Sequence, residues 1–267
     1  NIVFSDSTKG WIPLDDDVAA FEPSAPPTQK AIFGYGNSGS ATSITNLVNS
    51  SGVIAADVSG VGTARQDLAA TSYGGDKALF GYGDAASGYV SVTNLVSNLG
   101  VVSADVTGVG TARASPAACR FGSDKAIFGY GVSSGGKVSL TNLVSNTGVV
   151  ASDVSGVGTA RNNLAAAEFG VGKGIFGYGD TGSVSSLTNL VSDLGVVASD
   201  VSGVGTARRQ LGAASYGGDK GVFAYGDSGS RVSLKNLVNN LGVVAADVTG
   251  VGTARETLAA AGYSFSA

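Results

Sequence analysis

The sequence contains no His and no Met, a single Cys at position 119, and only 5 Pro among its 267 residues. Without His, the chain has neither Ser-His-Asp nor Cys-His catalysis, and it lacks the usual zinc ligand and general base. Because a lone Cys forms no internal disulfide, packing alone must hold the fold together. These absences argue against an enzyme, and we expect no metal and no cofactor.

Charge and long apolar runs are also scarce. Only 13% of the residues are charged and the formal net charge is −4, whereas general nucleic-acid binding needs a basic surface. Asp interrupts every apolar stretch, so none approaches the ~18 residues of a membrane helix. We therefore expect no nucleic-acid partner and no membrane insertion. The chain begins at Asn1 and lacks Met, from which we expect a processed product or a piece of a longer protein.

What the sequence has instead is Gly, 42 residues in all, together with plentiful Val, Ala and Leu, a balance that favours many short strands. It also has repeats, and these dominate its pattern. Three markers recur five times in the same order, every 47 or 48 residues: Lys followed by Ala or Gly, an apolar pair and G-Y-G or A-Y-G, then NLV, then GVGTAR. The GVGTAR segments end at Arg65, Arg113, Arg161, Arg208 and Arg255.

Each repeat reads as four short strands, shown here for the copy that follows Arg161. The expected strands are Leu164 to Phe169, Lys173 to Tyr178, Ser186 to Val191 and Val196 to Val201. No window keeps the spacing of an amphipathic helix. Four strands in a unit of this length are typical of a propeller blade. The sequence therefore predicts an all-β fold, a five-bladed β-propeller of four-stranded blades whose small, Ala-rich first strands crowd around the axis.

The ends of the chain predict how this ring closes. The first repeat begins at Lys30 with a second strand, and the chain ends in a first strand, Leu258 to Tyr263. We expect these two to share one blade, since a closed ring leaves no open strand edge. The propeller then spans residues 30–267.

Residues 1–29 lie outside the repeats. We expect a strand in NIVFSDST and a Pro-rich linker from Glu22 to Gln29. Asp15 to Asp17 lack the spacing of a calcium loop and are interpreted as solvated. We expect this arm to attach the chain to another structural protein.

The Arg before each first strand, and the strand that ends in Gly, resemble the kelch repeat of galactose-oxidase-type propellers. That resemblance implies the propeller fold and its closure by a C-terminal strand; the late Trp of the kelch repeat is missing here, and the oxidase's copper chemistry requires His. The wording IFGYG, TNLV and GVGTAR is also similar to repeats in large structural proteins of tailed phages. Five blades of this length are similar in architecture to the sugar-binding tachylectins.

Some polar and aromatic residues recur in every repeat and have two interpretations. The repeated Arg and Asp would form five ligand sites, or they tie strand ends together; we favour ties. The repeated Tyr would stack on sugars or fill the core; we favour the core. GVG and GYGD lack the following helix that a phosphate cradle needs, and Cys119 is expected to be buried and inert. The Asp positions are Asp57, Asp105, Asp153, Asp200 and Asp247, and the Tyr positions are Tyr35, Tyr82, Tyr130, Tyr178 and Tyr225.

Two other sets of residues differ from repeat to repeat: the loops between second and third strands, and the residue pairs after each repeated Arg. In a four-stranded blade both emerge on the same face, so we predict that they converge there; neutral drift at exposed loops is the alternative. The candidate ligand-binding residues are Asp84, Lys137, Asp180, Asp227 and Arg231 on outer loops, with Gln66, Asp67, Asn162, Asn163, Arg209 and Gln210 nearer the axis.

Two functions from different classes fit this pattern best. The first is a non-enzymatic virion component (tail-fibre or capsid-associated) or cell-surface component that presents a recognition face, in many copies on a particle. The alternative is a stand-alone glycan-binding lectin. A glycosidase using carboxylates such as Asp67, Asp84, Asp180 and Asp227 ranks third. The expected location is the virion or the extracellular surface, and the expected partner is a surface glycan or another structural protein.

Overall fold

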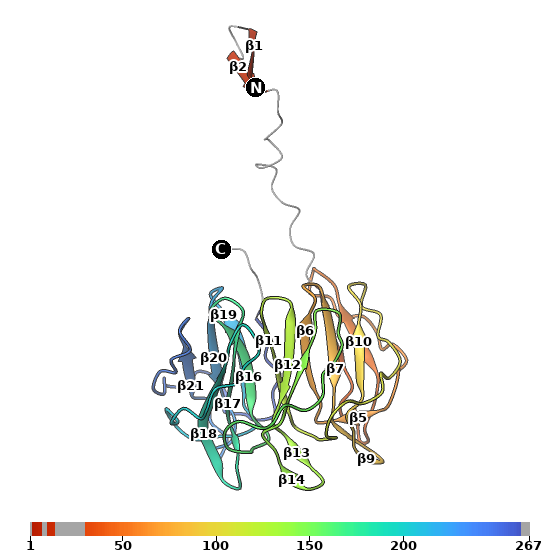
Figure 1. The fold of residues 1–267 in the computed structure, drawn as a ribbon, viewed down its shortest axis with the longest axis vertical. Helices are drawn as coiled ribbons and strands as arrows, with labels where there is room; N and C mark the ends of the chain where they lie inside the picture. The colour runs from red at the N-terminus through yellow and green to blue at the C-terminus, as the bar shows by residue number, and fades with distance from the viewer. Residues whose placement is uncertain (1, 7–9, 14–29, 263–267) are drawn as a thin grey trace. The chain divides into compact units, whose positions relative to one another are not determined.

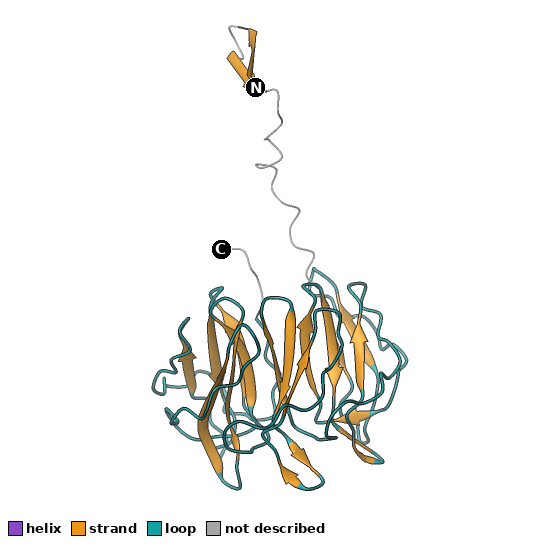
Figure 2. Cartoon of the chain, in the orientation of Figure 1, coloured by secondary structure: helices purple, strands orange, loops and turns teal. Residues whose placement is uncertain are grey.

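The computed structural model describes residues 2–6, 10–13 and 30–262, and every regular element among them is a β-strand (Figures 1 and 2). The described part of the chain is therefore all-β, as the sequence predicts. No helix in these ranges is long and apolar enough to cross a membrane. The chain divides into two compact units, residues 1–33 with 46–56, and residues 34–45 with 57–267.

The smaller unit contains a short hairpin. Strand β1 (Ile2–Asp6) pairs antiparallel with β2 (Gly10–Pro13), with Val3 opposite Ile12. The strand expected in NIVFSDST is thus confirmed, while β2 was not anticipated. The acidic run Asp15 to Asp17 and the Pro-rich segment Glu22 to Gln29 lie outside the described residues. Most of β3 (Ala31–Gly34) and β4 (Thr45–Val48) also belongs to this unit, and these two strands pair.

The larger unit contains a three-stranded antiparallel sheet for each of four successive repeats. Their first strands lie side by side, β6 beside β11, β11 beside β16 and β16 beside β19 (Figure 1). In pairing order the sheets are β6 (Ala69–Tyr73), β7 (Lys77–Gly81), β10 (Thr93–Val96); β11 (Ala117–Phe121), β12 (Lys125–Gly129), β15 (Thr141–Val144); β16 (Ala165–Phe169), β17 (Lys173–Asp180), β18 (Val184–Val191); and β19 (Gly212–Tyr216), β20 (Lys220–Ala224), β21 (Lys235–Val238).

Five further short strands form two small separate sheets, and Figure 1 shows β5, β9, β13 and β14 at one end of the larger sheets. Strand β8 (Asp84–Ala85) pairs with β5 (Arg65–Gln66) on one side and with β9 (Gly88–Tyr89) on the other. Strands β13 (Val132–Ser133) and β14 (Gly136–Lys137) form a hairpin. The loops expected between second and third strands therefore carry their own local pairing.

Neighbouring sheets share apolar cores, and Gly residues let them approach closely. Phe128 of β12 is fully buried among side chains of the preceding sheet, including Leu79 and Tyr82. A Cβ added to Gly81, the first Gly of G-Y-G, would lie 2.6 Å from the Phe128 ring. Only Gly leaves room for a ring lying against the backbone. The small residues of the repeat are therefore a requirement of sheet-to-sheet packing.

The expected fourth strand is not a regular strand, and this prediction was wrong. The backbone of Val196 to Val201 pairs with β18 at two isolated bridges and forms no continuous ladder. Between them Asn189 turns its side-chain amide outward and donates to Ala198 O (3.0 Å) and to Asp200 Oδ1 (2.9 Å). A side chain thus replaces part of the backbone ladder, and the segment bulges to bring Asp200 to it. The bridges are Val191 with Val197 and Thr188 with Val201.

The last expected first strand, Leu258 to Tyr263, also forms no regular strand over its described residues 258–262. It nevertheless lies against β19, because a Cβ added to Gly212 would be 3.2 Å from Ala260 Cβ and 3.3 Å from Leu258 Cγ. A strand needs a hydrogen-bonded partner, and none of the described residues pairs with this segment as a ladder.

Strand β3 likewise has one partner among the described residues, β4. The side chain of Phe33 on β3 is 52% exposed, whereas its counterpart Phe80 on β7 is 4% exposed. The expected pairing of Leu258 to Tyr263 with Lys30 to Tyr35 therefore stays a prediction.

Candidate recognition face and the clamp beneath it

Four of the five repeated Arg residues are the largest fully buried side chains in the described part of the chain, with Arg65, Arg113, Arg161 and Arg208 at 0% exposure, whereas Arg255 is exposed. Each guanidinium lies over the ring of the Tyr from the preceding repeat, 4.0 Å from the ring centroid for Arg113 over Tyr82. The same Arg113 donates to Asn142 Oδ1 (2.7 Å) of the next NLV segment. A buried guanidinium needs such partners, because an unpaired charge in the interior is costly.

The repeated Asp completes the arrangement from the next repeat. Asp153 accepts bonds from the backbone N–H (2.9 Å) and hydroxyl (2.7 Å) of Thr111 and from Asn142 Nδ2 (2.9 Å). Partial burial opposes ionisation, but the bonds from Thr111 and Asn142 outweigh it and lower the pKa of Asp153. We call the Arg, Tyr, Asn and Asp together the clamp; its contacts are those of a structural tie.

The clamp also accounts for an unusual backbone conformation. Every clamp Tyr has a left-handed backbone, with φ of 63° or 64° at Tyr35, Tyr82, Tyr130, Tyr178 and Tyr225. Left-handed backbone is costly for a bulky residue and persists only where the surroundings impose it. Burial raises the pKa of Tyr82, Tyr130 and Tyr178 to about 12, although the Arg above each ring lowers it.

The second Gly of GVG approaches the same carboxylate. A Cβ added to Gly110 would lie 2.3 Å from Asp153 Oδ1 and 2.6 Å from Asn142 Nδ2. This space is already filled by side chains of the next repeat, so the GVG turn is occupied and is not a phosphate cradle.

Cys119 is buried, and burial raises the pKa of its thiol to about 12.

Above the clamp, the two variable sets come together. Residues that follow the clamp Arg pair with residues that open the loop after the second strand of the same sheet. We call the surface formed by these loops and pairs the variable face; it lies at the end of the sheets that carries β5, β9, β13 and β14 (Figure 1). The backbone pairs are Gln66 with Asp84, Ala114 with Val132, Asn162 with Asp180, and Arg209 with Asp227.

Four candidate residues of the variable face form one ion-pair network across three repeats. Asp180 accepts from Lys137 Nζ (2.6 Å) on one side and from Arg209 Nη1 (2.7 Å) on the other. Arg209 Nε also bonds Asp227 Oδ2 (3.1 Å). Hydrogen bonding from Lys137 outweighs desolvation and, with the bond from Arg209, lowers the pKa of Asp180 to about 2. These side chains are therefore held in place with alternating charge.

The other candidates lie nearby with different partners. Arg231 Nε bonds Glu256 Oε1 (3.1 Å), and Gln66 Oε1 accepts from Asn37 Nδ2. Among the described residues Asp67 forms no ion pair within 4.0 Å; burial, with the negative charge of Asp84, raises its pKa.

Asp67, Asn163 and Gln210 share a second feature with Ser115 and Thr257, a left-handed backbone with φ between 49° and 56°. After Asp67, each backbone N–H in this row donates to the carbonyl of the same position one repeat earlier. The N···O distances are 2.7 Å from Ser115 to Asp67, 3.3 Å from Asn163 to Ser115, 2.9 Å from Gln210 to Asn163, and 2.8 Å from Thr257 to Gln210. This row of residues therefore links each repeat to the next along the variable face.

Sequence reasoning missed some polar contacts. Glu256 and Asn37 belong to the variable sets but were not among the candidate residues. Matching opposite charges between the two sets would have paired Glu256 with Arg231. Arg120 and Glu168, from neighbouring first strands, approach to 3.9 Å. They are the charged residues of the otherwise uncharged strands β6, β11, β16 and β19. Their opposite charges on neighbouring first strands were the sequence signal that could have predicted this contact.

In the ranges that the structure describes, no three Asp, Glu, Cys or His side chains gather closely enough to hold a metal ion. The arrangement offers hydrogen-bond donors and acceptors of both charges, which suits recognition of a polar surface. No protein-family model matches the chain, and no curated protein matches its sequence.

Proposed function

We propose that the chain is a five-bladed β-propeller closed by Leu258 to Tyr263 beside Lys30 to Tyr35. Four sheets with adjacent first strands support four of the blades. For the fifth, the chain end repeats the internal contacts: Arg255 lies 3.7 Å over the Tyr225 ring, and the N–H of Gly226 donates to Arg255 O (2.9 Å). Among the described residues β3 pairs only with β4, and Leu258 to Tyr263 would supply its second hydrogen-bonded partner.

Deletion of Leu258 to Ala267 tests this closure. Removing the first strand of the shared blade would expose strand edges, so we expect loss of folded monomer and gain of aggregate. Size-exclusion chromatography and thermal unfolding measure both. An unchanged cooperative melting temperature would contradict the closed ring.

We further propose that the protein is a non-enzymatic recognition module, a virion component or cell-surface component that binds through the variable face. One observation carries this proposal: the residues shared by the repeats are used in the clamp and the cores, while the two variable sets come together and are ordered at one end. Drift at independent loops does not require ion pairs such as Lys137 to Asp180 to Arg209, which join three repeats. Residues 1–29 would attach the module to another structural protein.

The test compares two sets of carboxylates at opposite ends of the sheets. The face variant carries Ala at Asp84, Asp180 and Asp227. The matched control carries Ala at Asp76, Asp124 and Asp219, which lie in the turns between first and second strands. Both remove the same charge, so a difference between them reports position. We expect binding to host cells or to a glycan array to fall in the face variant and to persist in the control.

The same assay separates the alternatives. Binding of free glycans by the isolated chain would favour a lectin, in which individually weak contacts gain avidity from several sites or copies. Binding to cells without glycan binding would favour a protein partner. Equal binding by the face variant and the control would show that the variable face is not the site.

A further inference from the structure

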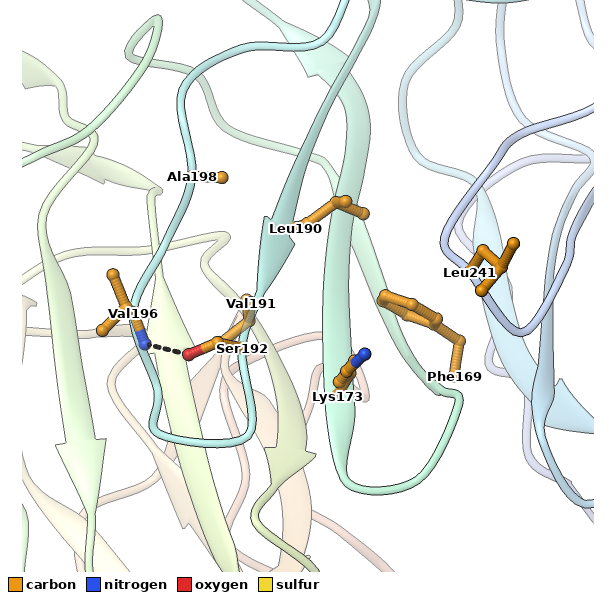
Figure 3. A pocket seen from close by; sticks show the side chains of 8 residues that line it. All are labelled: Phe169, Lys173, Leu190, Val191, Ser192, Val196, Ala198 and Leu241. Atoms are coloured by element: carbon orange, nitrogen blue, oxygen red, sulfur yellow. Dashed lines mark hydrogen bonds between the residues drawn. The ribbon is translucent and has the colours of Figure 1, made fainter.

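A pocket of about 320 Å³ opens on the flank of the β16–β17–β18 sheet (Figure 3). Its wall is apolar, formed by Phe169 and Leu190 of this sheet, by Val196 and Ala198 of the segment after β18, and by Leu241 from the turn after β21. Leu241 and Val196 are 72% and 65% exposed, so the wall is open to solvent. Lys173 stands at the pocket as its one charged residue.

Lys173 differs from the equivalent Lys of the other three sheets in its charge environment. There the preceding residue is Asp, and the ammonium lies 3.9, 3.1 or 3.0 Å from that carboxylate. Before Lys173 stands Gly172 instead. In the described part of the chain Lys173 has no ion pair within 4.0 Å. The pairs in the other sheets are Lys77 with Asp76, Lys125 with Asp124, and Lys220 with Asp219.

The turn itself is built differently where the Asp is missing. In the turn before Lys220 the left-handed residues are Gly217 and Gly218, whereas before Lys173 they are Gly170 and Gly172. A Cβ added to Gly172, whose φ is 67°, would lie 3.1 Å from Ser123 N. A carboxylate therefore cannot be placed beside Lys173 without changing the turn, and the local backbone keeps the ammonium uncompensated.

The neighbouring repeat fixes the opposite side of the pocket. A Cβ added to Gly242 would lie 2.8 Å from Leu190 Cδ2 and 2.8 Å from the Phe169 ring. This close approach holds the turn against the sheet and leaves Leu241 beside Phe169 (Figure 3). The pocket thus joins a fixed apolar wall to a single positive charge.

We propose that this pocket binds a small amphiphilic anion, with an alkyl or aryl group against Leu190, Val196 and Leu241 and a carboxylate at Lys173 Nζ. Apolar area supplies the affinity and the ammonium selects the charge. Its volume is near the lower end of the range for small-molecule sites, about 300–1,000 Å³. Lys173 begins β17 and Asp180 ends it, roughly 20 Å apart for a strand of this length. The site is therefore separate from the variable face and independent of the function proposed for it.

The direct test is a titration of the full chain, followed by NMR of its methyl groups, with octanoate, octanol and acetate. We expect octanoate to shift the Leu190, Val196 and Leu241 methyl signals in a saturable manner. Octanol, which lacks the charge, should bind more weakly, and acetate, which lacks the chain, should not bind. Equal affinity for octanoate and octanol, or shifts spread over the exposed Val and Leu of all repeats, would overturn the proposal.

Matched variants identify the charge. Lys173→Gln should weaken octanoate binding by about two- to fivefold, the range expected for an exposed charge pair, and leave octanol binding unchanged. Lys220→Gln, at the equivalent position with its Asp partner, should change neither. The double variant V171G/G172D restores the G-Asp-Lys turn of the other sheets and should weaken octanoate binding as Lys173→Gln does. Equal effects of Lys173→Gln and Lys220→Gln would contradict a specific site.

Discussion

Arg208 of the clamp and Arg209 of the variable face are adjacent in sequence, but their charged groups differ in burial and in partners. Arg208 is fully buried, while the side chain of its neighbour Arg209 is 40% exposed. Arg208 holds an interface between repeats; Arg209 links Asp180 and Asp227 at the surface. The comparison teaches that the shared residues provide a scaffold and that any specificity must come from the residues that differ.

The strongest way to break this comparison is to remove each Arg in turn. Arg208→Ala deletes the cation over the Tyr178 ring and leaves Asn236 Oδ1 without its 2.6 Å donor. We expect it to lower the free energy of unfolding by about 3–5 kcal/mol, as loss of a buried charged partner does. Arg209→Ala should cost less than about 1 kcal/mol. Urea denaturation compares them, and equal losses would refute the distinction.

The next test addresses the close approach of the sheets. Gly129→Ala would place a Cβ 2.6 Å from the Phe176 ring, so we expect a loss of about 1–3 kcal/mol from overpacking. The last repeat has Ala224 at this position, and Ala224→Gly, which only loosens the strand, should change stability by less than about 1 kcal/mol. The same urea denaturation measures both variants. A harmless Gly129→Ala would show that the cores adjust.

A pH titration sharpens the comparison on the side of the variable face. The pKa of Asp180 is lowered to about 2 by hydrogen bonds from Lys137 and Arg209. A carboxylate whose pKa falls on folding stabilises the protein above its unfolded pKa, and this stabilisation is lost as the pH drops through the folded value. Relative to Asp180→Asn, we expect a wild-type advantage of about 1–2 kcal/mol at pH 7. The advantage should shrink between pH 4 and pH 2; a constant difference would contradict the network.

The smallest expected effect concerns Cys119, a residue that differs between repeats although it lies on a buried first strand. Cys119 stands on β11 where the other first strands have Thr71, Ala167 and Ala214. Its thiol is buried and its pKa is raised to about 12, so the reactive thiolate is scarce. We expect labelling by a thiol reagent at pH 8 to proceed only at the rate of unfolding. Rapid labelling of the native protein would show that β11 opens locally.

Short apolar runs that recur with the repeat period were enough to predict three strands of each sheet. The fourth prediction failed because Val196 to Val201 is as apolar as a strand, whereas between its two bridges it bonds to the Asn189 side chain. The meeting of the two variable sets at one end of the sheets could be predicted from the order of the strands in each repeat.

The individual ion pairs did not follow from the sequence. Lys137 and Asp180 are 43 residues apart and meet only through sheet packing. The flank pocket depends on Leu241 from the next repeat, and no local pattern marks such a contact between repeats.

The row of left-handed residues from Asp67 to Thr257 has a consequence for how the protein could evolve. Every link joins the same position in successive repeats, and all links run in the same direction. A repeat duplicated in frame would carry both the N–H donor and the carbonyl acceptor that one more link requires. Gene duplication therefore supplies the hydrogen-bonding groups of this row with every new copy, while each copy also brings fresh loop residues for selection to change.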